Sequence, residues 1–228
     1  MTIALIGQGA IGSWIAERLE PAPVIVRRGD ALPQADVVVE VAGHGALVQY
    51  GVAALEQGSD LVIASIGALA DDELLQRLKA AATRSRILLP AGAVVGIDAL
   101  AAARRGGLDK VRYSSRKPPG SLSETLPTDR ESIVFEGNAR DAALQFPKNA
   151  NVAATIALAG VGFEATEVRI IADPTVAQNV HVLEASGAFG SFSARIAGKP
   201  LPGNPKSSSL TAMSVLRCIE NRTSPIVL

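Results

Sequence analysis

The chain has 228 residues, enough for one large domain or two smaller ones, and 48% of them are hydrophobic. Lys and Arg together number 22, as do Asp and Glu, and aromatic residues make up only 4%, which argues against nucleic acid or an anionic membrane as partner. No apolar run is long enough to span a bilayer, and the N-terminus lacks the pattern of a signal peptide. Cys218 is the only cysteine, as is typical of a reducing compartment, so we expect a cytoplasmic α/β enzyme.

The first predicted elements are a strand, a glycine turn and a helix. Residues 3–6 (IALI) form an apolar run, and residues 7–12 (GQGAIG) lead into an amphipathic segment. In this motif Gly7 permits a tight turn, Gly9 lets the backbone approach a pyrophosphate, and Gly12 lets the helix pack closely on the strand. The alternative is a tight turn with no ligand. The context favours a dinucleotide site, whose predicted members are Gly7, Gly9, Ala10, Ile11 and Gly12.

The second predicted strand, residues 23–30 (PVIVRRGD), bears on the choice of cofactor. A site that prefers NAD usually has an acid about 20 residues after the first glycine, but Arg27 and Arg28 occupy this place. Arginine pairs with the 2′-phosphate of NADP, whereas Asp30 is the alternative partner for a ribose hydroxyl. We expect NAD or NADP as cofactor, with NADP accepted; an ordinary solvated turn is the competing interpretation of the two arginines.

Strands and helices continue to alternate up to residue 92. The strand patterns at 35–42, 60–65 and 86–92 are separated by helical patterns at 45–58 and 71–84. This order predicts a doubly wound parallel sheet, a Rossmann dinucleotide-binding domain, which binds ligands beyond the carboxyl ends of its strands. Small residues at those ends leave room for a flat cofactor, among them Ala42, Gly43, Ala91 and Ala93.

The pattern changes in the second half of the chain. Here the predicted strands are closely spaced, with a loop rich in proline and serine at 118–132. We expect residues 1–108 to form the Rossmann domain and residues 109–206 an α+β domain with an antiparallel sheet. We expect a C-terminal helix within 207–228 to pack back onto the first domain. The predicted strands of the second domain are 111–117, 133–139, 166–173, 178–186 and 190–198, and its predicted helices are 139–146 and 149–163.

One of the two histidines, His181, lies in the strand pattern at 178–186. Because side chains alternate along a strand, Asn179 and His181 share one face, while Val180 and Val182 share the other. Two polar residues side by side suggest a face towards a cleft, where a histidine can carry protons. Judged alone, however, a core histidine with satisfied hydrogen bonds is the more common case.

Several long blocks of this chain resemble the L-aspartate dehydrogenases of the NAD-biosynthesis type. The resemblance implies oxidation of L-aspartate to iminoaspartate with NAD or NADP. The imine then hydrolyses to oxaloacetate and ammonia, or feeds quinolinate synthesis. The blocks lie at 7–12, 39–47, 64–71, 89–111, 115–120, 146–163, 171–193 and 199–217.

The resemblance also implies roles for particular residues. It makes His181, in the block DPTVAQNVH, the catalytic residue, and Asn151 a cofactor contact together with an alanine, Ala91 or Ala93. A substrate with two carboxylates needs cationic or N–H partners, although each candidate is equally plausible as a solvated surface group. The candidate substrate contacts are Arg116, Lys117, Asn179, Lys206 and Ser207.

Other interpretations compete with this one. The chain is alternatively a dehydrogenase or reductase of another amino, imino or oxo acid, or a nucleotide-sensing protein without catalysis. The loop after residue 120 looks shorter than is usual in the family, which bears on substrate choice. Two distant histidines and one cysteine do not form a metal site. We expect a homodimer, because the sheet of the second domain offers a face or edge for pairing.

Overall fold

The computed structural model describes residues 1–123, 125–146 and 151–227, apart from the side chains of Pro205 and Lys206. The chain divides into two compact units. The first unit consists of Met1–Gly92, Leu201–Ser207 and Thr211–Leu228, and the second of Ala93–Pro200 and Ser208–Leu210.

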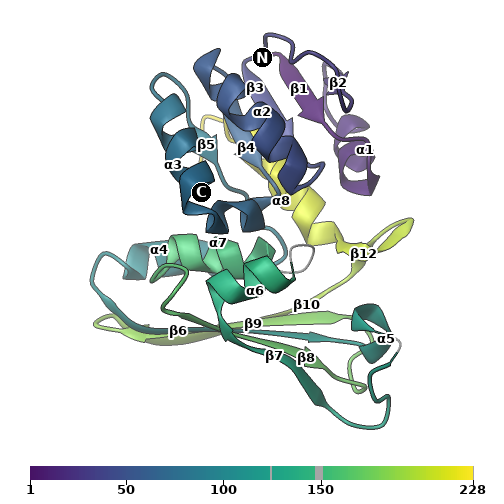
Figure 1. The fold of residues 1–228 in the computed structure, drawn as a ribbon. Helices are drawn as coiled ribbons and strands as arrows, with labels where there is room; N and C mark the ends of the chain where they lie inside the picture. The colour runs from purple at the N-terminus through teal and green to yellow at the C-terminus, as the bar shows by residue number, and fades with distance from the viewer. Residues whose placement is uncertain (124, 147–150, 228) are drawn as a thin grey trace. The chain divides into compact units, whose positions relative to one another are not determined.

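The first unit is built on a five-stranded parallel sheet with the order β2-β1-β3-β4-β5 (Figure 1). From β1 the chain first adds β2 on one side and then adds β3, β4 and β5 on the other side. The order of the strands therefore reverses between β1 and β3, and sheets of this kind bind ligands at such a topological switch point. The predicted doubly wound parallel sheet is confirmed. Its strands are β1 (Ile3–Ile6), β2 (Val24–Val26), β3 (Val37–Glu40), β4 (Asp60–Ile63) and β5 (Ile87–Leu88).

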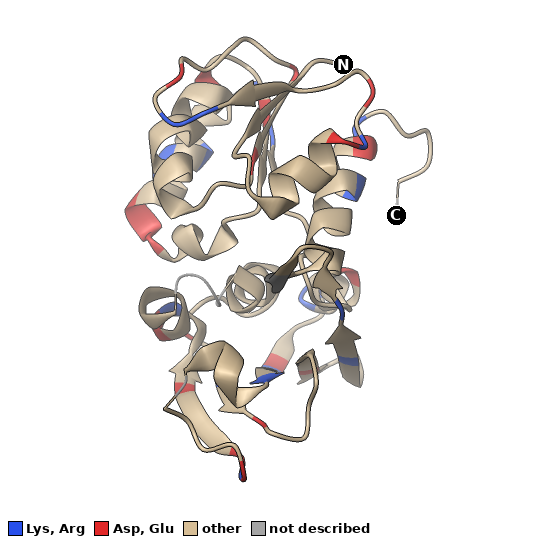
Figure 2. Cartoon of the chain, turned by 90° about the vertical axis from the view of Figure 1, so that its right-hand side faces the viewer, with Lys and Arg blue, Asp and Glu red and all other residues tan. Residues whose placement is uncertain are grey.

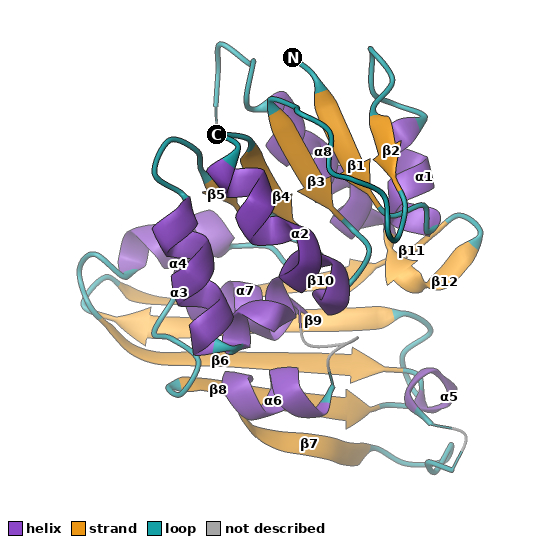
Figure 3. Ribbon diagram, turned by 45° about the horizontal axis from the view of Figure 1, so that its top comes forward, coloured by secondary structure: helices purple, strands orange, loops and turns teal. Residues whose placement is uncertain are grey.

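Helices cover both faces of this sheet; Figure 3 shows α2 in front of it and α8 behind it. On one face, Ile15 of α1 and Val215 and Ile219 of α8 form a buried cluster with strand residues. On the other face, a Cβ at Gly51 of α2 would lie 2.8 Å from the side chain of Leu78 in α3, so these helices pack tightly. The C-terminal helix therefore completes the core of the first unit. The helices are α1 (Ala10–Ala16), α2 (His44–Glu56), η1 (Ile66–Ala70), α3 (Asp72–Ala81) and α8 (Ser209–Glu220).

The second unit is a five-stranded sheet with the order β10-β9-β6-β8-β7. Figure 1 shows α4, α6 and α7 along one face of it. The strands are β6 (Leu108–Lys117), β7 (Ser132–Asn138), β8 (Thr166–Ala172), β9 (Asn179–Gly187) and β10 (Gly190–Gly198). The helices are α4 (Ile97–Ala103), α5 (Pro119–Leu122), α6 (Ala139–Gln145) and α7 (Asn151–Ala159), and a short hairpin follows, β11 (Pro200–Leu201) with β12 (Asn204–Ser208).

The second sheet is mixed, so the prediction of an antiparallel sheet is wrong for one pair. Strands β6 and β8 run parallel, while the other pairings are antiparallel. Parallel neighbours need a long crossover connection, which β7, α6 and α7 supply between β6 and β8. Alternation within each strand does not reveal the direction of its neighbour, which is why the sequence pattern missed this.

The boundary between the units lies at residues 92 and 93, not at 108 and 109 as expected. Helix α4 packs against α7 of the second unit. A guanidinium nitrogen of Arg104, just after α4, donates to the carbonyl of Leu158 at 3.1 Å, and Leu100 lies against Gly160. Because α4 follows a predicted parallel strand, its sequence pattern predicts one more βα repeat of the first unit. Only the residues against which α4 packs show that it belongs to the second unit.

The two faces of the second sheet differ in chemistry. Side chains of Val111, Tyr113, Ser115 and Lys117 on β6 are buried on the helix-covered face. The open face carries ion pairs such as Arg112 with Glu167, at 2.9 Å. Figure 2 shows charged residues of both signs interspersed along both units. Among the described residues, no helix has both the length and the apolar character needed to cross a membrane.

Candidate functional site

The glycine turn of the first unit joins β1 to α1 with very little space. Gly7 has φ +110°, a left-handed backbone conformation that favours glycine. A Cβ at Gly12 would lie 2.1 Å from the carbonyl oxygen of Gly7, so no other residue fits there without a shift. A Cβ at Gly9, in contrast, would meet no atom within 4 Å among the described residues. The backbone of Gly9 is thus open to a ligand, and Ala10 and Ile11 begin α1 beside it.

A pocket of about 560 Å³ lies next to this turn, at the carboxyl ends of β1, β2 and β3. Its volume is within the range of sites for small molecules and cofactors. The pocket brings together five of the residues predicted for the cofactor, namely Gly7, Arg27, Arg28, Ala42 and Gly43. His44, just after the predicted strand 35–42, also lines it; the sequence left open whether His44 lines the pocket or is a structural turn residue. The pocket further includes residues that the sequence did not single out for this role: Ile6, Gln8, Val26, Gly45, Ala46, Gln49 and Tyr50.

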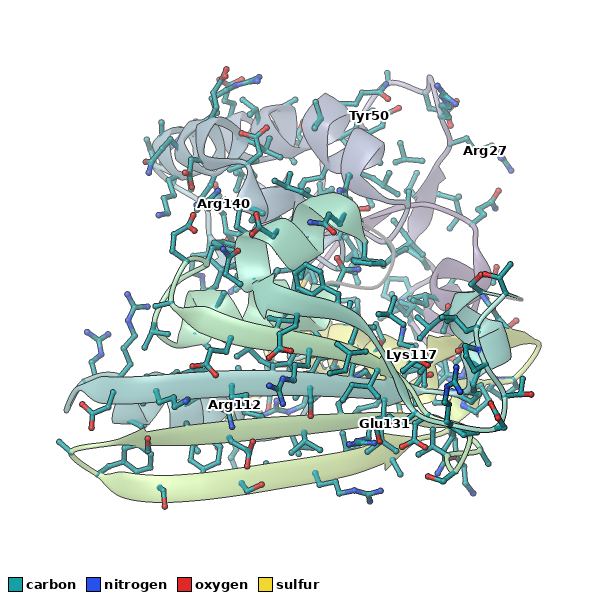
Figure 4. The ribbon with its side chains drawn as sticks, turned by 60° about the horizontal axis from the view of Figure 1, so that its bottom comes forward. Arg27, Tyr50, Arg112, Lys117, Glu131 and Arg140 are labelled. Carbon is teal, nitrogen blue, oxygen red and sulfur yellow. The ribbon has the colours of Figure 1, made fainter. Side chains whose placement is uncertain are left out.

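The loop after β2 is held by Tyr50 of α2, and Figure 4 labels Tyr50 and Arg27. The hydroxyl of Tyr50 accepts from the N–H of Gly29 at 3.2 Å and lies 3.1 Å from the carbonyl oxygen of Asp30. The Asp30 carboxylate accepts from the backbone N–H of Arg27 at 2.8 Å, and Arg27 Nε donates to Gln8 Oε1 at 3.2 Å. Asp30 therefore caps its own turn, while the arginines line the pocket.

A buried carboxylate fixes the loop between β3 and α2. Glu40 is fully buried, and its oxygens accept from the N–H groups of Ala42 and Gly43, both at 2.7 Å, and from the N–H and hydroxyl of Ser65. Burial raises the pKa of Glu40, and these hydrogen bonds act in the opposite direction. Glu40 was not among the predicted site residues; the signal for it was a single acidic residue inside an apolar strand. Its effect is to hold Ala42 and Gly43 at the pocket.

In the second unit, His181 hydrogen-bonds to a tyrosine on the neighbouring strand. His181 is 5% exposed, and its Nδ1 lies 2.8 Å from the hydroxyl oxygen of Tyr113. The face it shares with Asn179 also carries the buried Leu183 and Ala185, so within this unit it is the helix-covered face and not one turned away from the core. Burial, together with the charge of Lys117, lowers the pKa of His181 to about 4, which keeps the imidazole neutral at pH 7.

The two basic residues at the end of β6 lie on opposite faces of the sheet. Lys117 is buried on the side of Tyr113 and Ser115, and burial lowers its pKa to about 8. Arg116 is on the open face and pairs with Glu131 at 2.6 Å and Asp173 at 2.7 Å. The sheet thus places Lys117, but not Arg116, on the face of His181. Figure 4 shows Lys117 near one end of the sheet and Arg112 nearer the other end.

The residues predicted near the last helix lie in a strand instead. Helix α8 begins at Ser209, so Lys206 and Ser207 belong to β12 and not to the helix N-terminus. The Ser207 hydroxyl accepts from the side-chain amide of Asn204 at 3.1 Å. The side chain of Lys206 lies outside the described part of the structure. The helical pattern of the sequence runs through these serines because small polar residues fit both conformations.

The remaining predicted residues lie outside the pocket. Ala91 is half-buried at the end of the first unit, and Ala93 is buried at the start of the second. Asn151 begins α7, where its carbonyl accepts from the Thr155 hydroxyl at 2.9 Å. Within the described ranges, no three His, Cys, Asp or Glu side chains gather in a way that could hold a metal ion.

Family models match both halves of the chain. Residues 98–222 match the model described as aspartate dehydrogenase, C-terminal. Residues 15–90 match the model described as homoserine dehydrogenase, NAD binding domain.

Whole-chain relatives agree with the match in the second half. The chain is 44% identical to an L-aspartate dehydrogenase of Ralstonia nicotianae, with 98% of each chain covered, and 44% identical to one of Pseudomonas aeruginosa, with 99% covered. The crystal structure of an aspartate dehydrogenase from Thermotoga maritima superposes with a TM-score of 0.84 at 32% identity, covering 100% of this chain and 99% of the other. A hyperthermophilic archaeal homoserine dehydrogenase, at 12% identity and a TM-score of 0.55, shares the fold alone.

Proposed function

The chain belongs to the aspartate dehydrogenase family, and on this premise we propose that it oxidises L-aspartate to iminoaspartate with NAD or NADP. The imine then hydrolyses to oxaloacetate and ammonia or is consumed in pyridine-nucleotide synthesis. The observation that carries the proposal is a buried, neutral imidazole, His181, on the same sheet face as the buried ammonium of Lys117.

The chemistry requires a base for the substrate amine. A bound nicotinamide would supply the acceptor for the hydride of the substrate α-carbon. An α-carbon that bears an ammonium group does not release hydride readily, because the nitrogen has no lone pair to form the C=N bond. The amine therefore first loses a proton, and His181 takes it. A neutral imidazole is the form that can accept a proton, and His181 is neutral over the physiological range.

Lys117 suits a substrate carboxylate. Lys117 is buried on the face of His181, and its charge lowers the pKa of His181. A carboxylate beside Lys117 would offset this charge and bring the pKa of His181 back towards its ordinary value, making it a better base when the substrate is bound. We propose Lys117 and Asn179 as substrate contacts, with Lys206 and Ser207 of β12 as further candidates. Arg116 is excluded from this set because it is paired on the open face.

The first unit fits a dinucleotide. The open backbone at Gly9 and the forced glycine at Gly12 suit a pyrophosphate beside residues 7–12, and the pocket at Ala42 and Gly43 extends this surface. We propose Asn151 and one alanine, Ala91 or Ala93, as contacts nearer the nicotinamide.

The loop after β2 favours NADP over NAD. The carboxylate of Asp30 is engaged by the N–H of Arg27, whereas both arginines line the pocket. A guanidinium there pairs with a 2′-phosphate, and no carboxylate lines the pocket to bind the ribose diol among the described residues. We propose that the protein uses both cofactors and binds NADP more tightly.

The test follows the absorbance of reduced nicotinamide with L-aspartate, comparing wild type with His181→Ala. Loss of the base should lower kcat by about 10²–10⁴-fold. Cofactor affinity should be unchanged, which the fluorescence of Trp14, the only tryptophan, reports from within α1. Near-normal turnover in the variant would exclude His181 as the base. Reduction with another amino acid but not L-aspartate in a substrate panel would overturn the substrate.

Assembly and location complete the proposal. We propose a homodimer formed through the second sheet, whose open face presents charged pairs such as Arg112–Glu167. Sedimentation velocity tests this, since a monomer at micromolar concentration would contradict it. The single cysteine and the family both support a cytoplasmic enzyme.

A further inference from the structure

Three polar side chains lie together on the covered face of the second sheet. Tyr113, Ser115 and His181 are 1%, 2% and 5% exposed. Ser115 and His181 are directly opposite each other across β6 and β9, and Tyr113 is two residues before Ser115 on the same face. The rings of Tyr113 and His181 are nearly parallel, at 17°, with their centroids 6.0 Å apart. The three groups therefore share one small, water-poor region.

The hydrogen bond between Tyr113 and Nδ1 of His181 allows two arrangements of protons. A neutral imidazole carries one ring proton, and burial keeps the proton on the Tyr113 hydroxyl by raising its pKa. If Tyr113 donates to Nδ1, the ring proton is on Nε2, and Nε2 cannot accept another. If Nδ1–H donates to Tyr113, Nε2 keeps a free lone pair, and the tyrosine hydroxyl must donate elsewhere.

Ser115 offers the acceptor that the second arrangement needs. Its hydroxyl oxygen is buried and has no hydrogen-bond partner in the described part of the chain. It nevertheless lies close enough to Tyr113 to lower the pKa of the tyrosine, against the larger effect of burial. The two hydroxyl oxygens do not yet have hydrogen-bond geometry. A small movement of the Ser115 side chain towards Tyr113, with the Tyr113 hydroxyl donating to it, would satisfy the buried oxygen, which the first arrangement leaves unpaired.

We propose that Tyr113 and Ser115 are positioning residues that hold His181 as the Nδ1–H tautomer, leaving Nε2 as the atom that receives the substrate proton. The chain of donors runs from His181 Nδ1 to the Tyr113 oxygen and from the Tyr113 hydroxyl to Ser115. When Nε2 takes a proton, the same tyrosine oxygen continues to accept from the imidazolium, so no buried group has to reorient. This inference rests on the proposed role of His181 as base, but concerns which nitrogen performs it.

The direct test is nitrogen NMR of the full chain labelled with ¹⁵N-histidine. With only two histidines, a His44→Gln variant assigns the His181 signals without ambiguity. We expect a protonated, pyrrole-like Nδ1 and an unprotonated, pyridine-like Nε2 in the wild type at neutral pH. The reverse pattern in the wild type would overturn the proposal, whether or not the protein oxidises L-aspartate.

Variants then separate positioning from folding. Ser115→Ala should move the tautomer equilibrium towards Nε2–H and lower kcat by about 10-fold with the KM for cofactor unchanged, a fraction of the full effect of a general base. Ser115→Thr, which retains a hydroxyl, should restore the wild-type pattern. Ser114→Ala is the matched control, since Ser114 is on the opposite face of the same strand. A Ser115→Ala variant with wild-type tautomer and turnover would refute the role of Ser115.

Tyr113→Phe removes the oxygen that contacts Nδ1, and we expect a larger loss than with Ser115→Ala. Circular dichroism shows whether the variant folds. If Tyr113→Phe does not fold, the tautomer of His181 is decided by the wild-type NMR spectrum and the Ser115 variants. Absence of aspartate oxidation in the wild type, combined with an Nδ1–H signal, would retain the tautomer assignment and reject only the proposed function.

Discussion

The two units of this protein build their candidate sites from different materials. In the first unit the candidate site is formed mainly by the backbone. Gly7 has a left-handed conformation, Gly12 leaves no room for a Cβ, and the carboxylate of Glu40 holds the loop after β3 through backbone N–H groups. In the second unit the candidate site is formed by side chains: His181 and Lys117 lie on regular strands, on the helix-covered face of the sheet. A backbone site tolerates few residue types at its turns, whereas a strand site tolerates many and depends on their neighbours. The following changes test this contrast, from the largest expected effect to the smallest.

Replacing Gly12 with alanine should have the largest effect. The new Cβ would lie 2.1 Å from the Gly7 carbonyl oxygen, so the turn or α1 must move. We expect overpacking to destabilise the protein by about 1–3 kcal/mol, and misplacement of the turn to lower kcat/KM by about 100-fold. Chemical denaturation and steady-state kinetics measure the two effects.

Gly9→Ala is the matched control for Gly12→Ala. Its Cβ would meet no described atom within 4 Å, so stability should stay at the wild-type value while cofactor affinity falls. If both alanine variants unfolded equally, the distinction between a packing glycine and a ligand-facing glycine would fail.

Acid should weaken the second unit through His181. Its pKa in the folded protein is about 4, below its ordinary value of 6.5, so the unfolded chain binds the proton more readily between these values. The stabilisation is complete above the unfolded-state pKa and is lost as pH falls towards the folded-state pKa. From pH 7 to pH 5 we expect a loss of about 2 kcal/mol from this residue.

Denaturant unfolding of wild type and His181→Gln at the two pH values isolates this contribution. The wild type should lose more stability than the variant on acidification. Equal losses would show that His181 is protonated as easily in the folded protein as in the unfolded chain.

Cofactor choice should depend on Arg27 and Arg28. Removing both as alanines takes away the partners of a 2′-phosphate, so NADP affinity should fall by about 10-fold to 100-fold, while NAD affinity changes little. Titration of Trp14 fluorescence measures both. Arg77→Ala, on α3 and outside the pocket, is the control for loss of positive charge. Equal losses for NAD and NADP would remove the basis for NADP preference.

The smallest effect should come from Arg116→Gln. The half-buried side chain of Arg116 loses its pairs with Glu131 and Asp173, and we expect the variant to be less stable by about 0.5–1 kcal/mol. The KM for L-aspartate should not change, because Arg116 is on the face opposite Lys117. A tenfold rise in KM would return Arg116 to the substrate site.

The first unit was largely predictable from the sequence because its signals are local. Glycine spacing, apolar strands and helical periodicity specify the doubly wound sheet and place Gly7, Arg27 and Ala42 at the ends of strands that parallel pairing brings together. Tyr50 escaped prediction because its hydroxyl acts on a loop 20 residues earlier in the chain.

The second unit was less predictable because its signals depend on pairing. Alternation alone puts Tyr113, Ser115 and Lys117 on one face of β6, but only the register with β9 sets them beside His181. The parallel pairing of β6 with β8 and the membership of α4 likewise depend on long-range contacts that leave no local pattern. The resemblance to a family identified His181 as the candidate catalytic residue, but it did not identify Tyr113 as the hydrogen-bond partner of His181 Nδ1.

The position of α8 bears on how this protein is synthesised. Val215 and Ile219 complete a core whose other members include Ile3, Leu5 and Val37. A ribosome has therefore delivered the entire second unit before the first can close over its own sheet. The first residues to be synthesised, such as Ile3 and Leu5, therefore contact α8 only after nearly all of the chain has been made. A chain interrupted before residue 211 lacks α8, which packs on one face of the nucleotide-binding sheet.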